Sequence, residues 1–138
     1  MSKVKILVVE DEVIIADNLC DTLDELNYET LEPAINYTEA LEIISAEKPD
    51  IAILDIELGG RKTGIDLAIE IKKKYDFPFI FLTSNADSAT LEKAKKVNPS
   101  GYLVKPFTKE ELYTSIEIAL HNYSEKISEK ATTDLIVK

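Results

Sequence analysis

Acidic, hydroxyl and amino side chains stand at the ends of four short apolar runs in this sequence. Glu10 and Asp11 end the first of these runs, and Asp55 ends another. Thr83 and Lys105 end two later ones. Carboxylate oxygens are the ligands that Mg²⁺ prefers, and Mg²⁺ usually takes one or two carboxylates together with a phosphate oxygen. These residue types therefore predict a cation-assisted phosphoryl site, provided that the fold brings the ends of the runs together.

The elements that would position these residues are five β-branched or aromatic runs separated by helical patterns. The runs cover residues 4–9, about 28–31, 51–54, 79–82 and 102–104. Three of them are nearly continuous and apolar, as expected of parallel strands with both faces covered by helices. We therefore expect an α/β fold with a doubly wound, five-stranded parallel sheet and five helices. Ligands of such sheets bind at the carboxyl ends of the strands, where the polar residues lie.

Capping residues mark the starts of several helices. Asn36 and Glu39 are a capping pair for the second helix, and the third is expected to begin near Gly64. Thr108 and Glu111 form a T-x-x-E capping box for the fifth helix. The helical pattern thus agrees with the alternation of strands and helices.

Composition excludes several classes of protein. The chain has 138 residues, 45% of them hydrophobic and 30% charged, which is enough for one compact domain. Its formal charge of −10 disfavours direct binding to nucleic acid or to anionic membranes. Its apolar runs are far shorter than the roughly 20 residues of a membrane span, and the N-terminus lacks a signal-peptide pattern, so we expect a cytoplasmic protein.

Cys20 and His121 are the only cysteine and histidine of the chain. One cysteine forms no internal disulfide, and the pair cannot supply the ligands of a structural zinc site. Cys20 lies at helical spacing from apolar neighbours, so we expect it to be a buried packing residue rather than a redox switch.

Five motifs, taken in order, resemble the receiver domains of two-component response regulators over about residues 3–124. They are Glu10-Asp11, the I-L-D run that ends at Asp55, G-G-R-K-T-G-I-D-L-A from Gly59, Thr83-Ser84, and Y-L-V-K-P-F from Tyr102 to Phe107. The resemblance implies a flavodoxin-like sheet with strand order 2-1-3-4-5. It also implies a phosphorylation-dependent switch rather than an enzyme that acts on a separate substrate.

The resemblance assigns the acidic residues to phosphoryl transfer. It makes Asp55 the nucleophile, which would take a phosphoryl group and become an aspartyl phosphate. Asp11, Asp55 and the backbone carbonyl of Glu57 would bind Mg²⁺, or Mn²⁺ in its place, and Glu10 would do so directly or through water. The cation would offset charge in the transition state.

The resemblance also assigns the residues that respond to the phosphoryl group. Lys105 and the Thr83 hydroxyl would each contact one phosphoryl oxygen. The aromatic side chain of Tyr102 would change from exposed to buried, which remodels the face made by the fourth helix, fifth strand and fifth helix. The bond between Lys105 and Pro106 is a candidate cis peptide.

Two further positions concern the lifetime of the phosphoryl group. Glu57 lies two residues after Asp55, and Asn85 lies two residues after Thr83. Both would flank the path of the attacking water, so we expect them to influence autodephosphorylation.

The expected partner is a sensor histidine kinase or a phosphotransfer protein, which would supply the phosphoryl group. We also expect a homodimer through the face of the fourth helix, fifth strand and fifth helix after phosphorylation. Residues 1–127 would form the receiver domain, and residues 128–138 would be a linker or the start of a truncated output domain.

Two other functions use the same residues. The first is a Mg²⁺-dependent phosphatase with an aspartyl nucleophile, for which Glu57 would be the second acid. Such an enzyme needs a lid, and the chain has no insertion long enough to form a cap. The second is an interaction module of the same shape that no longer takes phosphate.

Overall fold

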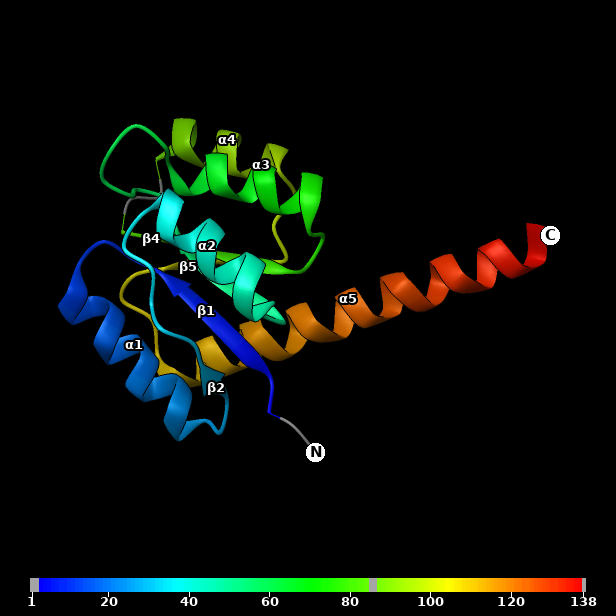
Figure 1. The fold of residues 1–138 in the computed structure, drawn as a ribbon, viewed down its shortest axis with the longest axis horizontal. Helices are drawn as coiled ribbons and strands as arrows, with labels where there is room; N and C mark the ends of the chain where they lie inside the picture. Colours follow the sequence, from blue (N-terminus) through cyan, green and yellow to red (C-terminus); the bar gives the residue numbers. More distant parts are fainter. Residues whose placement is uncertain (1–2, 85–86, 138) are drawn as a thin grey trace.

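The protein, described here by a computed structural model over residues 3–84 and 87–137, is built on one parallel sheet. The sheet has five strands in the order β2-β1-β3-β4-β5 (Figure 1). The strands are β1 (Lys5–Val9), β2 (Glu29–Thr30), β3 (Ile51–Asp55), β4 (Phe79–Thr83) and β5 (Gly101–Val104). The predicted α/β class and strand order are confirmed.

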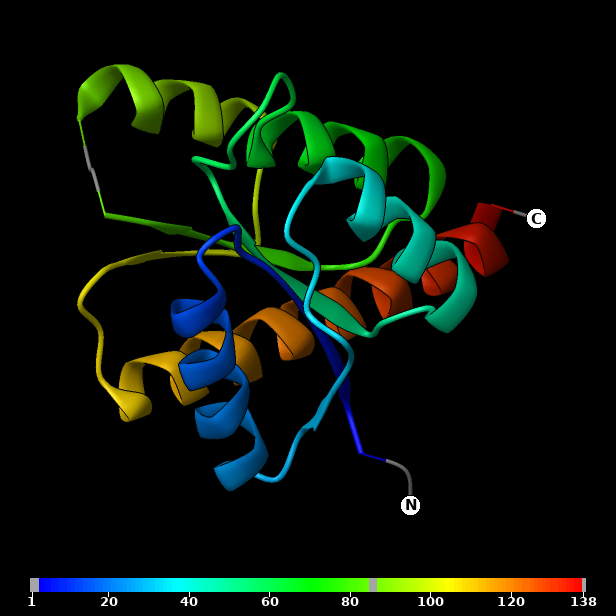
Figure 2. The same ribbon diagram turned by 60° about the vertical axis from the view of Figure 1, so that its left-hand side comes forward.

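Helices cover both faces of the sheet (Figure 2). They are α1 (Val13–Glu25), α2 (Tyr37–Glu47), α3 (Gly64–Lys74), α4 (Ser88–Lys96) and α5 (Lys109–Val137). One core layer joins α1 and α5 to the sheet, and the other joins α2, α3 and α4 to the opposite face. Every residue of β3 and β4 is buried, which explains why these runs show no polar alternation.

The predicted caps form at the starts of two helices. The Glu39 amide donates to Asn36 Oδ1 at 2.9 Å at the start of α2. At the start of α5, the Glu111 amide donates to Thr108 Oγ1 at 3.0 Å and the Thr108 amide donates to Glu111 Oε1 at 3.1 Å. Side-chain oxygens thus accept hydrogen bonds from amides that have no partner within the helix.

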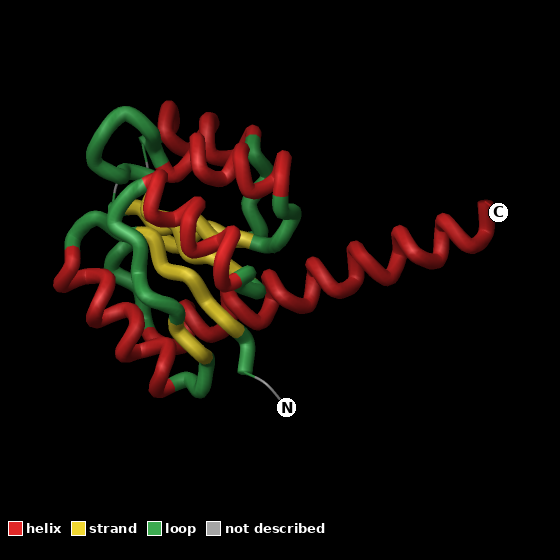
Figure 3. Tube along the Cα trace, in the orientation of Figure 1, coloured by secondary structure: helices red, strands yellow, loops and turns green. Residues whose placement is uncertain are grey.

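The last helix extends away from the rest of the fold (Figures 1 and 3). It is 29 residues long and continues through residues 128–137. The Tyr123 hydroxyl donates to the Asp76 carbonyl oxygen at 2.6 Å and so ties this helix to the turn before β4. Within the described part of the chain, no helix combines the length and the apolar character needed to cross a membrane.

Candidate functional site

The polar residues singled out from the sequence meet at the carboxyl edge of the sheet. β3 lies between β1 and β4, with Val9 opposite Leu54 and Asp55 opposite Leu82. β5 pairs with the other side of β4, with Val104 opposite Thr83. This register brings together side chains from the ends of four strands.

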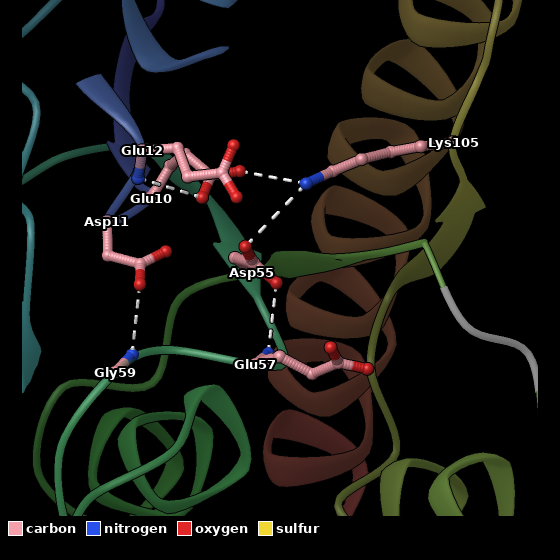
Figure 4. A network of polar contacts seen from close by, with 7 residues as sticks. All are labelled: Glu10, Asp11, Glu12, Asp55, Glu57, Gly59 and Lys105. Atoms are coloured by element: carbon pink, nitrogen blue, oxygen red, sulfur yellow. Dashed lines mark hydrogen bonds and ion pairs between the residues drawn. The ribbon is translucent and has the colours of Figure 1, made fainter. Parts of the chain in front are cut away.

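Three carboxylates form the centre of the site (Figure 4). Glu10, Asp11 and Asp55 each offer a ligand oxygen, and these oxygens lie within 4.8 Å of one another. Glu10 is 1% exposed and Asp55 is 6% exposed, whereas Asp11 faces solvent. Carboxylates this close repel one another, and an oxygen-rich, partly open cluster is the kind of donor set that a hard divalent cation neutralises. The residues present therefore fit such a cation.

Lys105 bridges two of these carboxylates (Figure 4). Its ammonium donates to Glu10 Oε1 at 2.8 Å and lies 3.6 Å from Asp55 Oδ2. The strong contact is therefore with Glu10, and the contact with Asp55 is longer than a hydrogen bond. The Lys105–Pro106 peptide bond that follows is cis.

Asp55 is held by the backbone that follows it. Its Oδ1 accepts a hydrogen bond from the Glu57 amide at 2.9 Å, while its Oδ2 faces Lys105. The Glu57 side chain is exposed, and its carboxylate points away from the other three (Figure 4). Glu57 therefore contacts Asp55 through its main chain.

The acidic pair on the first loop is fixed by amides as well. Asp11 Oδ2 accepts from the Gly59 amide at 3.2 Å, and Glu10 Oε2 accepts from the Glu12 amide at 3.3 Å. These two hydrogen bonds join the loop after β1 to itself and to the loop after β3. The carboxylates are thereby oriented before any ligand arrives.

A glycine behind Asp55 allows α3 to approach β3. A Cβ atom at Gly64 would lie 2.1 Å from the Asp55 carbonyl oxygen, a separation at which backbone would have to move. The helix starts there with a capping box, in which Thr63 and Asp66 bond to each other's amides. The start of this helix was predicted from the sequence, but the packing role of Gly64 was not, although glycine at the first helical position could have indicated it.

Burial and like charge dominate the electrostatics of the site. Burial, followed by the neighbouring Glu10, raises the pKa of Asp55 to about 7. Burial also disfavours the charged form of Glu10, but its contacts with Asp55 and Lys105 outweigh burial and lower its pKa. For Lys105, burial opposes the charged form, yet the two carboxylates raise the pKa above its ordinary value. In the described site, the Lys105 ammonium therefore does not fully neutralise the negative charge of the carboxylates.

The expected switch residues stand beside this cluster. Thr83 is fully buried at the end of β4. Tyr102 on β5 is half-buried and packs against the core layer of α2, α3 and α4. Its hydroxyl is enclosed, with no hydrogen-bond partner among residues 3–84 and 87–137. Asn85 lies outside the described residues.

The sequence matches one protein family over most of its length. The family is the response regulator receiver domain, and the match covers residues 6–117. This chain belongs to the response regulator receiver family. Receiver domains are signalling switches that interact with histidine kinases or phosphotransfer proteins, and this assigns the chain to two-component signalling.

Relatives and solved structures agree with this family. The transcriptional regulatory protein PdtaR of Mycobacterium tuberculosis is 36% identical over 121 residues, which cover 88% of this chain and 58% of PdtaR. The chain thus spans a little over half the length of this curated relative. The signal receiver domain of a modulated diguanylate cyclase from Desulfovibrio desulfuricans G20 is 38% identical with a TM-score of 0.83, covering 88% of this chain and 97% of that one. NtrX from Brucella abortus is 31% identical with a TM-score of 0.84, covering 98% of this chain and 30% of NtrX.

Proposed function

We propose that Asp55 accepts a phosphoryl group from a phosphohistidine of a sensor histidine kinase or phosphotransfer protein. The observation that supports this most is the position of Asp55, a buried carboxylate between an acidic pair and an ammonium. An Asp55 oxygen would attack phosphorus, the phosphorus–nitrogen bond would break, and the imidazole would leave with the bonding electrons. The product is an aspartyl phosphate that controls output.

The acidic cluster would hold Mg²⁺, or Mn²⁺ in its place. Glu10, Asp11, Asp55 and the backbone carbonyl of Glu57 are the residues that would do so, Glu10 directly or through water. The bound cation would offset negative charge on the transferring phosphoryl group. The raised pKa of Asp55 supports this assignment, since a cation favours the ionised carboxylate that attacks.

Lys105 and Thr83 would detect the phosphoryl group. The ammonium that now bonds Glu10 at 2.8 Å would take a phosphoryl oxygen as its partner, and the Thr83 hydroxyl would donate to another. Tyr102 would respond to the movement of Thr83 on the neighbouring strand. The face of α4, β5 and α5 would change as a result, which is the switch.

The lifetime of the phosphoryl group would depend on the side chains of Glu57 and Asn85. The Glu57 side chain is exposed while its amide donates to Asp55. Its position beside the acceptor supports a role in orienting or excluding water. Asn85 is assigned the same role from its position in the sequence.

At the level of the whole chain, we infer a cytoplasmic regulator whose receiver domain covers residues 1–127. Residues 128–138 would link this domain to an output segment, which the continuation of α5 supports. Phosphorylation would promote a homodimer through α4, β5 and α5. Of the similar proteins, PdtaR bears the name of a transcriptional regulator and another is a diguanylate cyclase, so the similarity does not point to a single kind of output.

The test is phosphorylation by a small donor. The protein is incubated with acetyl phosphate and Mg²⁺, and its intact mass is compared with that of Asp55→Asn. We expect one phosphoryl group on the parent and none on the variant. Asp50→Asn is the matched control, because Asp50 is an exposed acid that bonds the Lys5 amide and should leave labelling unchanged. Equal labelling of Asp55→Asn would refute the proposal, and steady turnover of a phosphoester by the purified protein would favour the phosphatase.

A further inference from the structure

A groove between α1 and α2 lies outside the acidic site and has no role in the proposed switch. It encloses about 520 Å³ and is walled by α1, by α2 and by the segment between β2 and α2. Figure 2 shows that segment, in cyan, running between the two helices. A hollow of this size lies within the range of ligand and peptide sites.

The groove has an apolar floor that is partly open to water. Ala16 is buried at its base, and Ile43 is half-buried. Val13 and Ile35 stand at its edge with 60% and 42% of their surfaces exposed. Adjacent exposed aliphatic side chains beside a hollow are a common feature of surfaces that bind another chain.

The rim of the groove is acidic. Its lining includes Asp17, Glu32, Glu39 and Glu42 and no lysine or arginine. Glu39 accepts a hydrogen bond from the Ile35 amide, whereas the other three acids face solvent. Because no base lines the groove, its negative charge is not neutralised locally.

Two acids of the rim also lie close enough to Cys20 to affect its thiol. Burial raises the pKa of Cys20 to about 11, and Asp17 and Glu32 from the rim add to the effect together with Asp21 and Asp24. The acids therefore act on a group inside the fold as well as on solvent. A cationic ligand would be attracted to this side of the molecule.

We propose that this groove docks a basic amphipathic helix of a partner protein. The apolar face of that helix would cover Val13, Ile35 and Ile43, and flanking lysines or arginines would pair with Asp17, Glu32 and Glu42. This is helix-in-groove recognition, in which aliphatic anchors give affinity and charges give specificity. The proposal is independent of phosphorylation, because the groove does not include Glu10, Asp11 or Asp55.

A second copy of this chain is the poorer occupant. Each copy carries a formal charge of −10, so two copies repel one another before contact. The groove would also have to bind a different surface of the next copy, and such a contact forms open chains unless it closes into a ring. A partner of opposite charge has neither disadvantage.

The test uses a displayed library of helical peptides, about 15 residues or four turns long. The library is selected on the wild-type protein, and the enriched peptides are measured by titration calorimetry and by amide chemical shifts. We expect enrichment of sequences with Lys or Arg beside aliphatic residues at helical spacing. The shifts should concentrate at the groove, and affinity should fall as salt rises.

Pairs of charge-reversal variants test whether the selected peptides bind at the groove. Asp17→Lys with Glu42→Lys should weaken binding at least about tenfold, and Ile35→Asp should do the same by breaking the apolar wall. Glu125→Lys with Glu129→Lys makes the same charge change on the extension of α5 and should change affinity less than about twofold. Circular dichroism checks that every variant is folded.

Four outcomes would overturn the proposal. They are selection of acidic or uncharged peptides, shifts that map to α4, β5 and α5, equal affinity of the Asp17→Lys/Glu42→Lys variant, and loss of the groove's shifts on dilution of the protein alone. The last would show that a second copy occupies the groove.

Discussion

At the scale of single residues, the acidic cluster crowds like charges into a partly buried site. Asp55 is 6% exposed beside Glu10, and one ammonium serves both carboxylates. Two like charges about 4 Å apart repel by roughly 1–4 kcal/mol at dielectric constants between water and the protein surface. The metal-free site should therefore be strained by charge.

Removing the charge of Asp55 should stabilise the metal-free protein. We expect Asp55→Asn to raise the free energy of unfolding by about 1–2 kcal/mol in EDTA at pH 8, because the repulsion with Glu10 is lost. Urea unfolding measures this change. Asp50→Asn, at an exposed acid on the opposite edge, should stay within about 0.5 kcal/mol of wild type. An unchanged or lower value for Asp55→Asn would contradict this reading of the cluster.

At the scale of elements, the ends of the strands determine where the chemistry lies. The sequence predicted the five strands and the starts of the capped helices to within a few residues, since buried strands and helix caps leave strong local patterns. The end of the last helix was not predicted, because α5 continues ten residues beyond residue 127. The contacts across the site were not predictable in the same way. The Lys105–Glu10 pair and the close packing of Gly64 on Asp55 depend on how separate elements meet, which spacing along the chain does not encode.

The close approach of α3 to β3 leads to a stability prediction. Gly64→Ala should lower the free energy of unfolding by about 1–3 kcal/mol, because the new methyl group meets the Asp55 carbonyl at 2.1 Å. Gly59→Ala is the control, since its methyl group meets only the end of the Asp11 side chain, at 3.2 Å. Denaturant unfolding compares the two, and equal losses would show that the backbone contact is unimportant.

The packing of α1 leads to a pH prediction at Cys20, whose pKa is raised to about 11 from 9.0. At pH 8 the folded protein should react with iodoacetamide about 100-fold more slowly than the unfolded chain, because the thiolate is the nucleophile. Because the folded protein holds the Cys20 proton more tightly than the unfolded chain, this group's contribution to the free energy of unfolding is complete below pH 9. That contribution is lost as pH rises from 9 to 11. Cys20→Ser should lack that loss, and equal alkylation rates for folded and unfolded protein would contradict the prediction.

At the scale of the whole molecule, charge and exposed apolar groups decide which surfaces can meet. The net charge of −10 opposes association, so a dimer needs an apolar patch. Val104 on β5 and Ile118 on α5 are 43% and 51% exposed on the elements assigned to the switch face. We expect that face to favour association of two copies only after phosphorylation repacks it.

Phosphorylation should therefore increase self-association, and Ile118→Glu should abolish the increase. Sedimentation velocity with and without acetyl phosphate measures the dimer fraction. Ile35→Glu is the matched control, because Ile35 is a 42% exposed isoleucine after β2, at the opposite edge of the sheet from β5. A dimer fraction that does not change on phosphorylation would show that the switch acts on another surface.

The most direct test of the account is to locate the phosphoryl group on the chain. The protein is phosphorylated with acetyl phosphate, reduced with borohydride to convert the acyl phosphate to an alcohol, and sequenced by mass spectrometry. The account predicts reduction at Asp55 alone, and only when Mg²⁺ or Mn²⁺ is present. Reduction at another residue, or at Asp55 equally well in EDTA, would contradict it.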